Sequence, residues 1–126
     1  MTNTRKRKPL VLHIEDYAPT QYLRSEILSR GGYRVSNVST IRDAMAAAAL
    51  ESPDVILCDV KLPDGTGFQI CREMRTVQPD VPVILISAAH RDEFARQTAV
   101  FTGAAEYLVE PVAPEELVAA IKRHIR

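Results

Sequence analysis

Short, nearly all-apolar runs alternate with longer amphipathic segments along the chain from residue 10 onward. These runs have strand length and predict strands over residues 10–14, 55–58, 83–86 and 106–109, and the more polar residues 34–38 predict a short edge strand, which makes five. The segments between them predict helices, over residues 19–30, 40–50, 68–77, 91–101 and 114–126. Strands that are apolar on both faces and joined by helices form parallel sheets covered on both sides. The pattern therefore predicts an α/β fold, a doubly wound five-stranded parallel sheet with helices on both faces.

The helical segments also indicate which side chains are buried. In the first predicted helix, Leu23, Ile27 and Leu28 recur at helical spacing and form its apolar stripe. The cysteines, Cys58 and Cys71, fall in different segments without metal-binding spacing and are predicted to be reduced core thiols. Residues 61–67 are rich in turn-forming residues and are predicted to be a loop.

Length and composition limit the protein to one globular domain. The chain has 126 residues, of which 46% are hydrophobic and 25% charged. It has neither the apolar stretch of about 20 residues that a membrane helix needs nor a signal-peptide core, so a cytoplasmic protein without a membrane partner is expected. The formal net charge is zero, so the composition does not indicate a nucleic-acid binder. Residues 1–8 contain a basic cluster and are predicted to be a flexible arm preceding a domain over residues 9–126.

Polar side chains stand at the ends of four of the predicted strands. Glu15 and Asp16 follow the first, Asp59 the third, Ser87 the fourth and Glu110 the fifth. Ligands of doubly wound sheets bind at the carboxyl ends of the strands, near the point where the strand order reverses. These residues are therefore the candidates for the functional site.

Three carboxylates at one sheet edge repel each other, by about 4 kcal/mol per pair at 4 Å and an effective dielectric near 20. A cation is therefore expected among them. An all-oxygen cluster suits Mg²⁺, or Mn²⁺, and such an ion assists phosphoryl transfer. One carboxylate could then be a nucleophile, with the Ser87 hydroxyl near a phosphoryl oxygen. The alternative is that Glu15, Asp16 and Asp59 only cap helices or turns.

Four stretches together resemble the receiver domain of bacterial two-component response regulators, over residues 10–126. They are "VLHIEDYAPT", "PDVILCDVKLPDGTGF", "VPVILISA" and "GAAEYLVEPV". The resemblance implies the flavodoxin-like receiver topology, a Mg²⁺ site and a phosphoacceptor rather than an enzyme. By position, the metal ligands would be Glu15, Asp16, Asp59 and the backbone carbonyl of Lys61. Asp59 would be the phosphoacceptor, Ser87 the switch hydroxyl and Tyr107 the switch aromatic.

The same resemblance implies partners. A sensor histidine kinase or a histidine phosphotransfer protein would donate the phosphoryl group. A downstream protein would bind the face formed by the fourth helix, the fifth strand and the fifth helix. A homodimer is left open, and no direct contact with nucleic acid is expected.

Glu110 departs from the family pattern, which has lysine before this proline. A carboxylate there would repel a phosphoryl group unless it turned away, was protonated or joined the metal. The Lys61 side chain could compensate by reaching toward the phosphoryl oxygens, although a solvated loop lysine is the simpler interpretation. Tyr107 could likewise be an ordinary strand aromatic packed against the last helix.

Two functional hypotheses follow. The first is a single-domain response regulator that is phosphorylated on Asp59. The second is an atypical receiver-like interaction module that acts without phosphorylation, because Glu110 replaces the switch lysine. An aspartyl-nucleophile phosphatase is disfavoured, since it needs an acid two residues after the nucleophile, where Lys61 stands.

Overall fold

The computed structural model describes residues 7–88 and 93–125, so most of the predicted basic arm lies outside the described residues. The helices are α1 (Ala18–Arg30), α2 (Ile41–Glu51), α3 (Gly67–Val77), α4 (Glu93–Thr102) and α5 (Pro114–His124). The strands are β1 (Leu10–Ile14), β2 (Arg34–Val38), β3 (Val55–Asp59), β4 (Lys61–Leu62), β5 (Gly65–Thr66), β6 (Val83–Ser87) and β7 (Glu106–Val109). Within the described part of the chain, no helix has the length and apolar character needed to span a bilayer.

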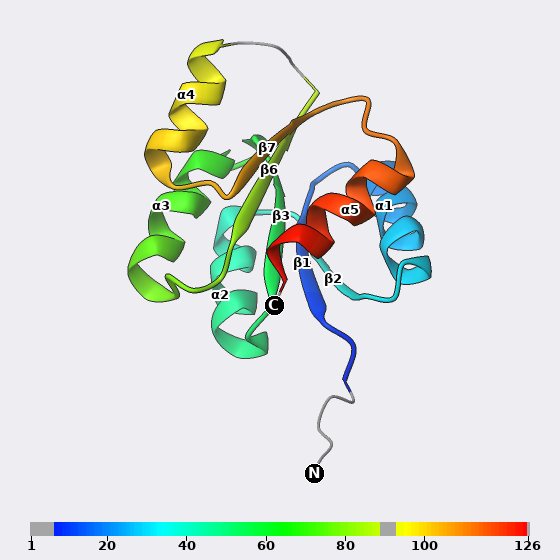
Figure 1. Cartoon of the computed structure of the whole chain (residues 1–126). Coiled ribbons are helices and arrows are strands. Elements are labelled where there is room, and N and C mark those ends of the chain that lie inside the picture. The colour runs from blue at the N-terminus through cyan, green and yellow to red at the C-terminus, as the bar shows by residue number, and fades with distance from the viewer. Residues whose placement is uncertain (1–6, 89–92, 126) are drawn as a thin grey trace.

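Five strands form one sheet in the order β2-β1-β3-β6-β7, and every neighbouring pair is parallel. The predicted fold class is therefore confirmed. Successive strands extend the sheet first from β1 to β2 and then, through β3, toward β7 on the other side. The strand order therefore reverses at β1 and β3, whose carboxyl ends lie side by side (Figure 1).

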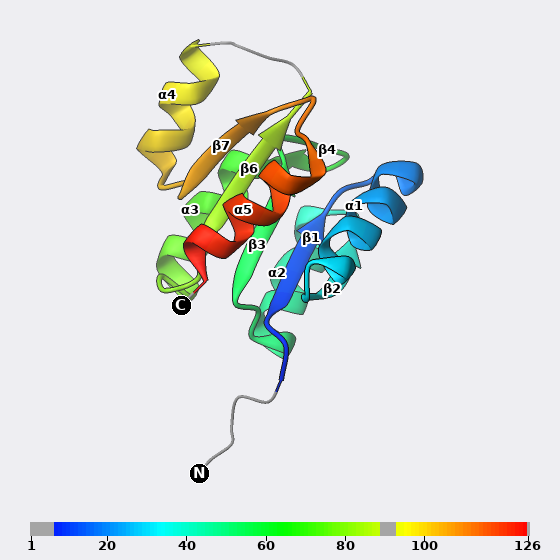
Figure 2. The same ribbon diagram turned by 45° about the vertical axis from the view of Figure 1, so that its right-hand side comes forward.

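Helices cover both faces of the sheet. Helices α1 and α5 lie on one face, whereas α2, α3 and α4 lie on the other (Figures 1 and 2). Each face has its own apolar core, and β1 contributes to both, with Leu12 and Ile14 packed on the α2–α4 side and Val11 on the α1–α5 side. Both faces exclude water, which is why β1, β3 and β6 are apolar at nearly every position.

The predicted apolar stripe of α1 is partly wrong. Leu28 is buried as predicted, but Leu23 is 59% exposed, and Arg24 is buried with only 4% of its surface accessible. Arg24 and Leu28 are four residues apart and share one helix face, so Arg24 occupies a core position. It tolerates burial because its guanidinium has acidic partners at the sheet edge. The cysteines are free and buried, as predicted.

The predicted loop over residues 61–67 contains a small antiparallel hairpin, formed by β4 and β5. At its turn, the Asp64 carboxylate accepts hydrogen bonds from the backbone N–H groups of Ile41 and Arg42, at 2.9 and 3.2 Å. These N–H groups belong to the first turn of α2, which lacks internal acceptors for them. The segment that follows Asp59 is thereby tied to α2.

Gly67 brings the start of α3 against the end of β3. Its N–H donates to the Val60 carbonyl at 2.8 Å. A Cβ at this position would lie 2.6 Å from the Asp59 carbonyl oxygen and 2.8 Å from Leu85 Cδ2. Because both neighbours belong to central strands, neither can move away easily.

Gly67→Ala is expected to lower the free energy of unfolding by about 1–3 kcal/mol, since the added methyl group overpacks this junction. Urea denaturation measures the change. Gly31→Ala is the matched control, because Gly31 has an ordinary φ of −79° and the closest neighbours of its Cβ would be the Val118 side-chain methyls, with the Leu28 carbonyl oxygen at 3.4 Å. Equal losses in the two variants would contradict the close approach.

Candidate functional site

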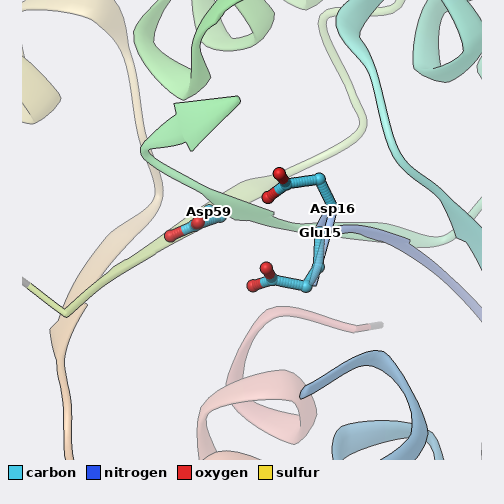
Figure 3. Close-up of side chains that lie close together, drawn as sticks. All are labelled: Glu15, Asp16 and Asp59. Carbon is cyan, nitrogen blue, oxygen red and sulfur yellow. The ribbon is translucent and has the colours of Figure 1, made fainter. Parts of the chain in front are cut away.

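Three carboxylates meet at the carboxyl edge of the sheet. Glu15 and Asp16 follow β1 directly, and Asp59 is the last residue of β3. Because β1 and β3 are parallel neighbours, their ends bring the three side chains to one place. Their oxygens lie within 4.8 Å of one another, and the side chains converge on a common space (Figure 3). The predicted acidic cluster is therefore present.

Glu15 is the most buried member, with 5% of its surface accessible. Its Oε2 accepts from the backbone N–H of Tyr17 at 3.0 Å, and its Oε1 lies 3.2 Å from an Arg24 guanidinium nitrogen. Its own N–H donates to the Val38 carbonyl of β2 at 3.0 Å. The carboxylate thus satisfies a backbone group at the start of α1, as the capping alternative requires, and it also faces the cluster.

Asp59 is half-buried, and its surroundings raise its pKa. Burial, and then the charge of Glu15, raise its pKa from 3.8 to about 6. Arg24 and a backbone hydrogen bond oppose this rise, while Asp16, which is exposed, adds to it. At neutral pH Asp59 is still largely ionised and can act as a nucleophile or metal ligand.

A cavity of about 360 Å³ opens beside Asp59 and is lined by Lys61, Ser87 and Ala88 as well. Ser87 ends β6, two strands away from β1, and is buried. The space is large enough for a phosphoryl group. Lys61 is exposed at its wall, which leaves both interpretations of its side chain open.

Tyr107 lies on β7 and is half-buried. It packs with the core on the α2–α4 side, and the Arg96 guanidinium lies over its ring, 5.2 Å from the centroid. The alternative of a ring packed against the last helix is therefore wrong, because α5 covers the opposite face. Alternation along β7 explains the difference, since Leu108, not Tyr107, points toward α5.

Glu110 forms an ion pair that the sequence did not reveal. Its Oε2 lies 2.7 Å from Nη2 of Arg24, and its backbone N–H donates to the Ser87 carbonyl at 2.9 Å. The peptide bond to Pro111 is cis. Arg24 therefore bridges Glu15 and Glu110, and it is a cation that the sequence analysis, which expected Mg²⁺, did not predict. The signal that could have found it is a charged residue four positions before Leu28, on the face that a helix buries.

The donor set fits a hard divalent cation. All the side-chain donors are carboxylate oxygens, and their mutual spacing permits one ion to contact several of them. The resemblance adds the backbone carbonyl of Lys61 as a ligand. Lys61 lies two residues after Asp59, at the start of β4. The described part of the chain offers no histidine or cysteine to this cluster.

Comparison with known proteins agrees with this geometry. The family model of the response regulator receiver domain matches residues 11–122. The transcriptional regulatory protein GltR of Pseudomonas aeruginosa is 36% identical over 118 residues, which cover 92% of this chain and 48% of GltR. The phosphate regulon regulator PhoB of Escherichia coli is 31% identical over 92% of this chain and 51% of its own length. The chain thus spans about half the length of these curated relatives.

Solved structures have the same architecture. Chemotaxis response regulator CheY4 of Vibrio cholerae superposes with a TM-score of 0.87 at 27% identity, covering 94% of this chain and 100% of that one. A response regulator receiver domain protein of Methanospirillum hungatei gives 0.86 at 25% identity, covering 93% of both chains. This chain belongs to the family of response regulator receiver domains.

The shifted acidity of Asp59 gives a testable pH dependence. Its folded-state pKa of about 6 exceeds the unfolded value of 3.8, so protonated Asp59 favours the folded chain at low pH. This contribution is complete below about pH 4 and is lost as the pH rises through about 6. Asp59→Asn should therefore stabilise the metal-free chain at pH 7, by about 1–2 kcal/mol given the group's partial exposure.

Urea denaturation in a chelator, at several pH values between 4 and 7, measures this effect. The gain in Asp59→Asn should grow across that range. Asp80→Asn removes an exposed carboxylate from the segment between α3 and β6 and is the control. A gain that was equal at pH 4 and 7, or equal in the control, would contradict the raised pKa.

Proposed function

We propose that this receiver domain accepts a phosphoryl group on Asp59, with Mg²⁺ or Mn²⁺ held by Glu15, Asp16, Asp59 and the Lys61 carbonyl. The convergence of the three carboxylates beside an open cavity is the observation that carries the proposal. The donor would be a phosphohistidine of a sensor kinase or of a phosphotransfer protein. An Asp59 oxygen attacks phosphorus, the P–N bond breaks and its electron pair returns to the imidazole nitrogen. The product is an acyl phosphate on Asp59.

The residues around Asp59 have distinct roles in this proposal. Asp59 must be ionised to attack, which its pKa of about 6 allows at neutral pH. Ser87 would donate a hydrogen bond to a phosphoryl oxygen from its place on the cavity wall. A bound divalent cation would offset the negative charge that gathers on the phosphoryl oxygens. Tyr107, on the strand next to Ser87, would respond as the switch aromatic.

Glu110 does not argue against phosphorylation as strongly as its charge suggests. Its carboxylate is engaged by Arg24, so its negative charge is partly neutralised within the folded chain. This pair favours a phosphorylated receiver over the interaction module that acts without phosphate. The latter remains the outcome to expect if Asp59 proves inert.

Signalling would proceed by protein contact through the face of α4, β7 and α5. Large apolar side chains are exposed on α4, where Phe101 is 84% accessible and Phe94 and Val100 are also exposed. Such a face could bind a downstream protein or a second copy of the chain.

We also propose how the chain is organised. Residues 9–126 form a cytoplasmic domain, and residues 1–8 precede it as a basic arm. The domain makes no contact of its own with nucleic acid.

Intact-mass measurement after incubation with a small-molecule phosphodonor and Mg²⁺ tests the acceptor. Wild type should gain one phosphoryl group, and Asp59→Asn should gain none. Asp80→Asn, a distant carboxylate, should behave like wild type. If wild type gains no mass while Glu110→Lys does, the chain is instead an interaction module without a phosphate switch.

Mg²⁺ should raise the unfolding temperature of wild type at pH 7, because the ion binds the folded cluster and not the unfolded chain. Asp59→Asn and Asp16→Asn should each reduce this gain, while Asp80→Asn should not. Differential scanning fluorimetry across a Mg²⁺ series measures it. A gain of the same size in all variants would place the ion elsewhere.

A further inference from the structure

Arg24 occupies an unusual place for a cation. It lies on α1 and is almost fully buried, between the acidic cluster and Glu110, which follows the carboxyl end of β7. Its guanidinium contacts Glu15 Oε1 at 3.2 Å, Glu110 Oε2 at 2.7 Å and His13 Nε2 at 3.3 Å. Two of the three partners are carboxylates from different strands' ends. A planar guanidinium with several donors suits such a bridge better than an ammonium group does.

His13 and β2 hold the guanidinium in place. His13 is buried within β1, and this burial lowers its pKa to about 4, so the ring is neutral at pH 7. Its Nδ1 lies 2.8 Å from Asn37 Oδ1 and donates to it, which leaves the Nε2 lone pair to accept from Arg24. Asn37 Nδ2 in turn donates to Ser25 Oγ, on α1 next to Arg24, at 2.9 Å. The chain of hydrogen bonds runs from α1 through β2 and β1 and returns to α1.

The charges explain why this cation matters. Four carboxylates, those of Glu15, Asp16, Asp59 and Glu110, gather at this edge of the sheet. Among the described residues, Arg24 is the one cation that forms an ion pair with any of them. Its charge also reaches Asp59, on which it acts against the two neighbouring carboxylates. Without Arg24, Glu15 would be buried with no counter-charge.

We propose that Arg24 is the resident cation of the acceptor site, supplied from α1, and that Glu110 is its counter-ion. The pair then acts on Asp59 as a nearly neutral unit. Arg24 is a positioning residue, because its contacts are with Glu15, Glu110 and His13. The role in phosphorylation rests on the proposed function, but the charge pairing itself does not.

Mg²⁺ affinity, measured by isothermal titration with the metal alone, tests the pairing. Glu110→Gln keeps an acceptor for Arg24 but removes the negative charge, so Mg²⁺ binding should weaken by about fivefold. Arg24→Met removes the competing positive charge and should strengthen binding by about fivefold. The Arg24→Met/Glu110→Gln double variant removes one charge of each sign and should bind within about twofold of wild type.

Matched controls distinguish the charge pairing of Arg24 and Glu110 from direct binding of Mg²⁺ by Glu110 and from a merely structural role. Glu106→Gln also removes an ion-paired glutamate of the β7 segment, one whose partners are Arg123 and His124, and should leave Mg²⁺ affinity unchanged. Weak binding by the double variant would mean that Glu110 is itself a ligand, and would overturn the proposal. Unchanged binding in Glu110→Gln would overturn it as well.

Circular dichroism first establishes that each variant folds. If Arg24→Met does not fold, Glu110→Gln still tests the pairing, and Arg24→Lys, which keeps the charge, gives a second check. Mg²⁺ affinity in Arg24→Lys should stay within about twofold of wild type. A change of more than tenfold in folded Arg24→Lys would contradict a role based on charge.

Phosphorylation is the second readout. The yield of modified protein, measured by intact mass with a small-molecule phosphodonor, should fall at least threefold in Arg24→Met and recover in Arg24→Met/Glu110→Lys, in which the cation comes from the end of β7. Failure of that recovery in a folded double variant would overturn the proposal. If wild type is not phosphorylated, the proposed function fails, while the Mg²⁺ series still decides whether Arg24 and Glu110 form a neutral pair.

Discussion

Repulsion between carboxylates is the constraint on which the rest of this site depends. Parallel strands β1 and β3 end at the same edge, so Glu15, Asp16 and Asp59 are brought together by the sheet itself. Their convergence is unfavourable for folding and useful for binding a cation. Apolar cores on both faces of the sheet offset this repulsion and hold the strand ends together.

Burial raises the pKa of Asp59 most, and the uncompensated repulsion from Glu15 and Asp16 raises it further. Full neutralisation would give a more stable chain, but it would also remove the negative charge on which the proposed binding of a divalent ion depends. The protein instead neutralises the buried part of the cluster, where Arg24 meets Glu15, and leaves Asp16 and one side of Asp59 open. Burial thus divides the carboxylates into one group that serves the fold and another that faces solvent.

Most of the fold could be predicted from the sequence, because β1, β3 and β6 are apolar at nearly every position and alternate with amphipathic helices. The acidic cluster also followed, since its members stand at strand ends. Arg24 did not, because helical spacing alone favoured Leu23 as a core residue, and only the tertiary partners of Arg24 make its burial tolerable. The pairing of Glu110 joins residues 86 positions apart, and no local pattern encodes it.

The link between Arg24 and Glu110 also constrains how such a site can change during evolution. If glutamate arose at position 110 before the arginine, four carboxylates would share this edge without a buried cation. If arginine arose first, Glu15 would already be present as its partner. The second order keeps the site compensated at every step, so position 24 is the one that can change first. Glu110 should then occur only together with Arg24, and a chimera that exchanges α1 alone would separate them.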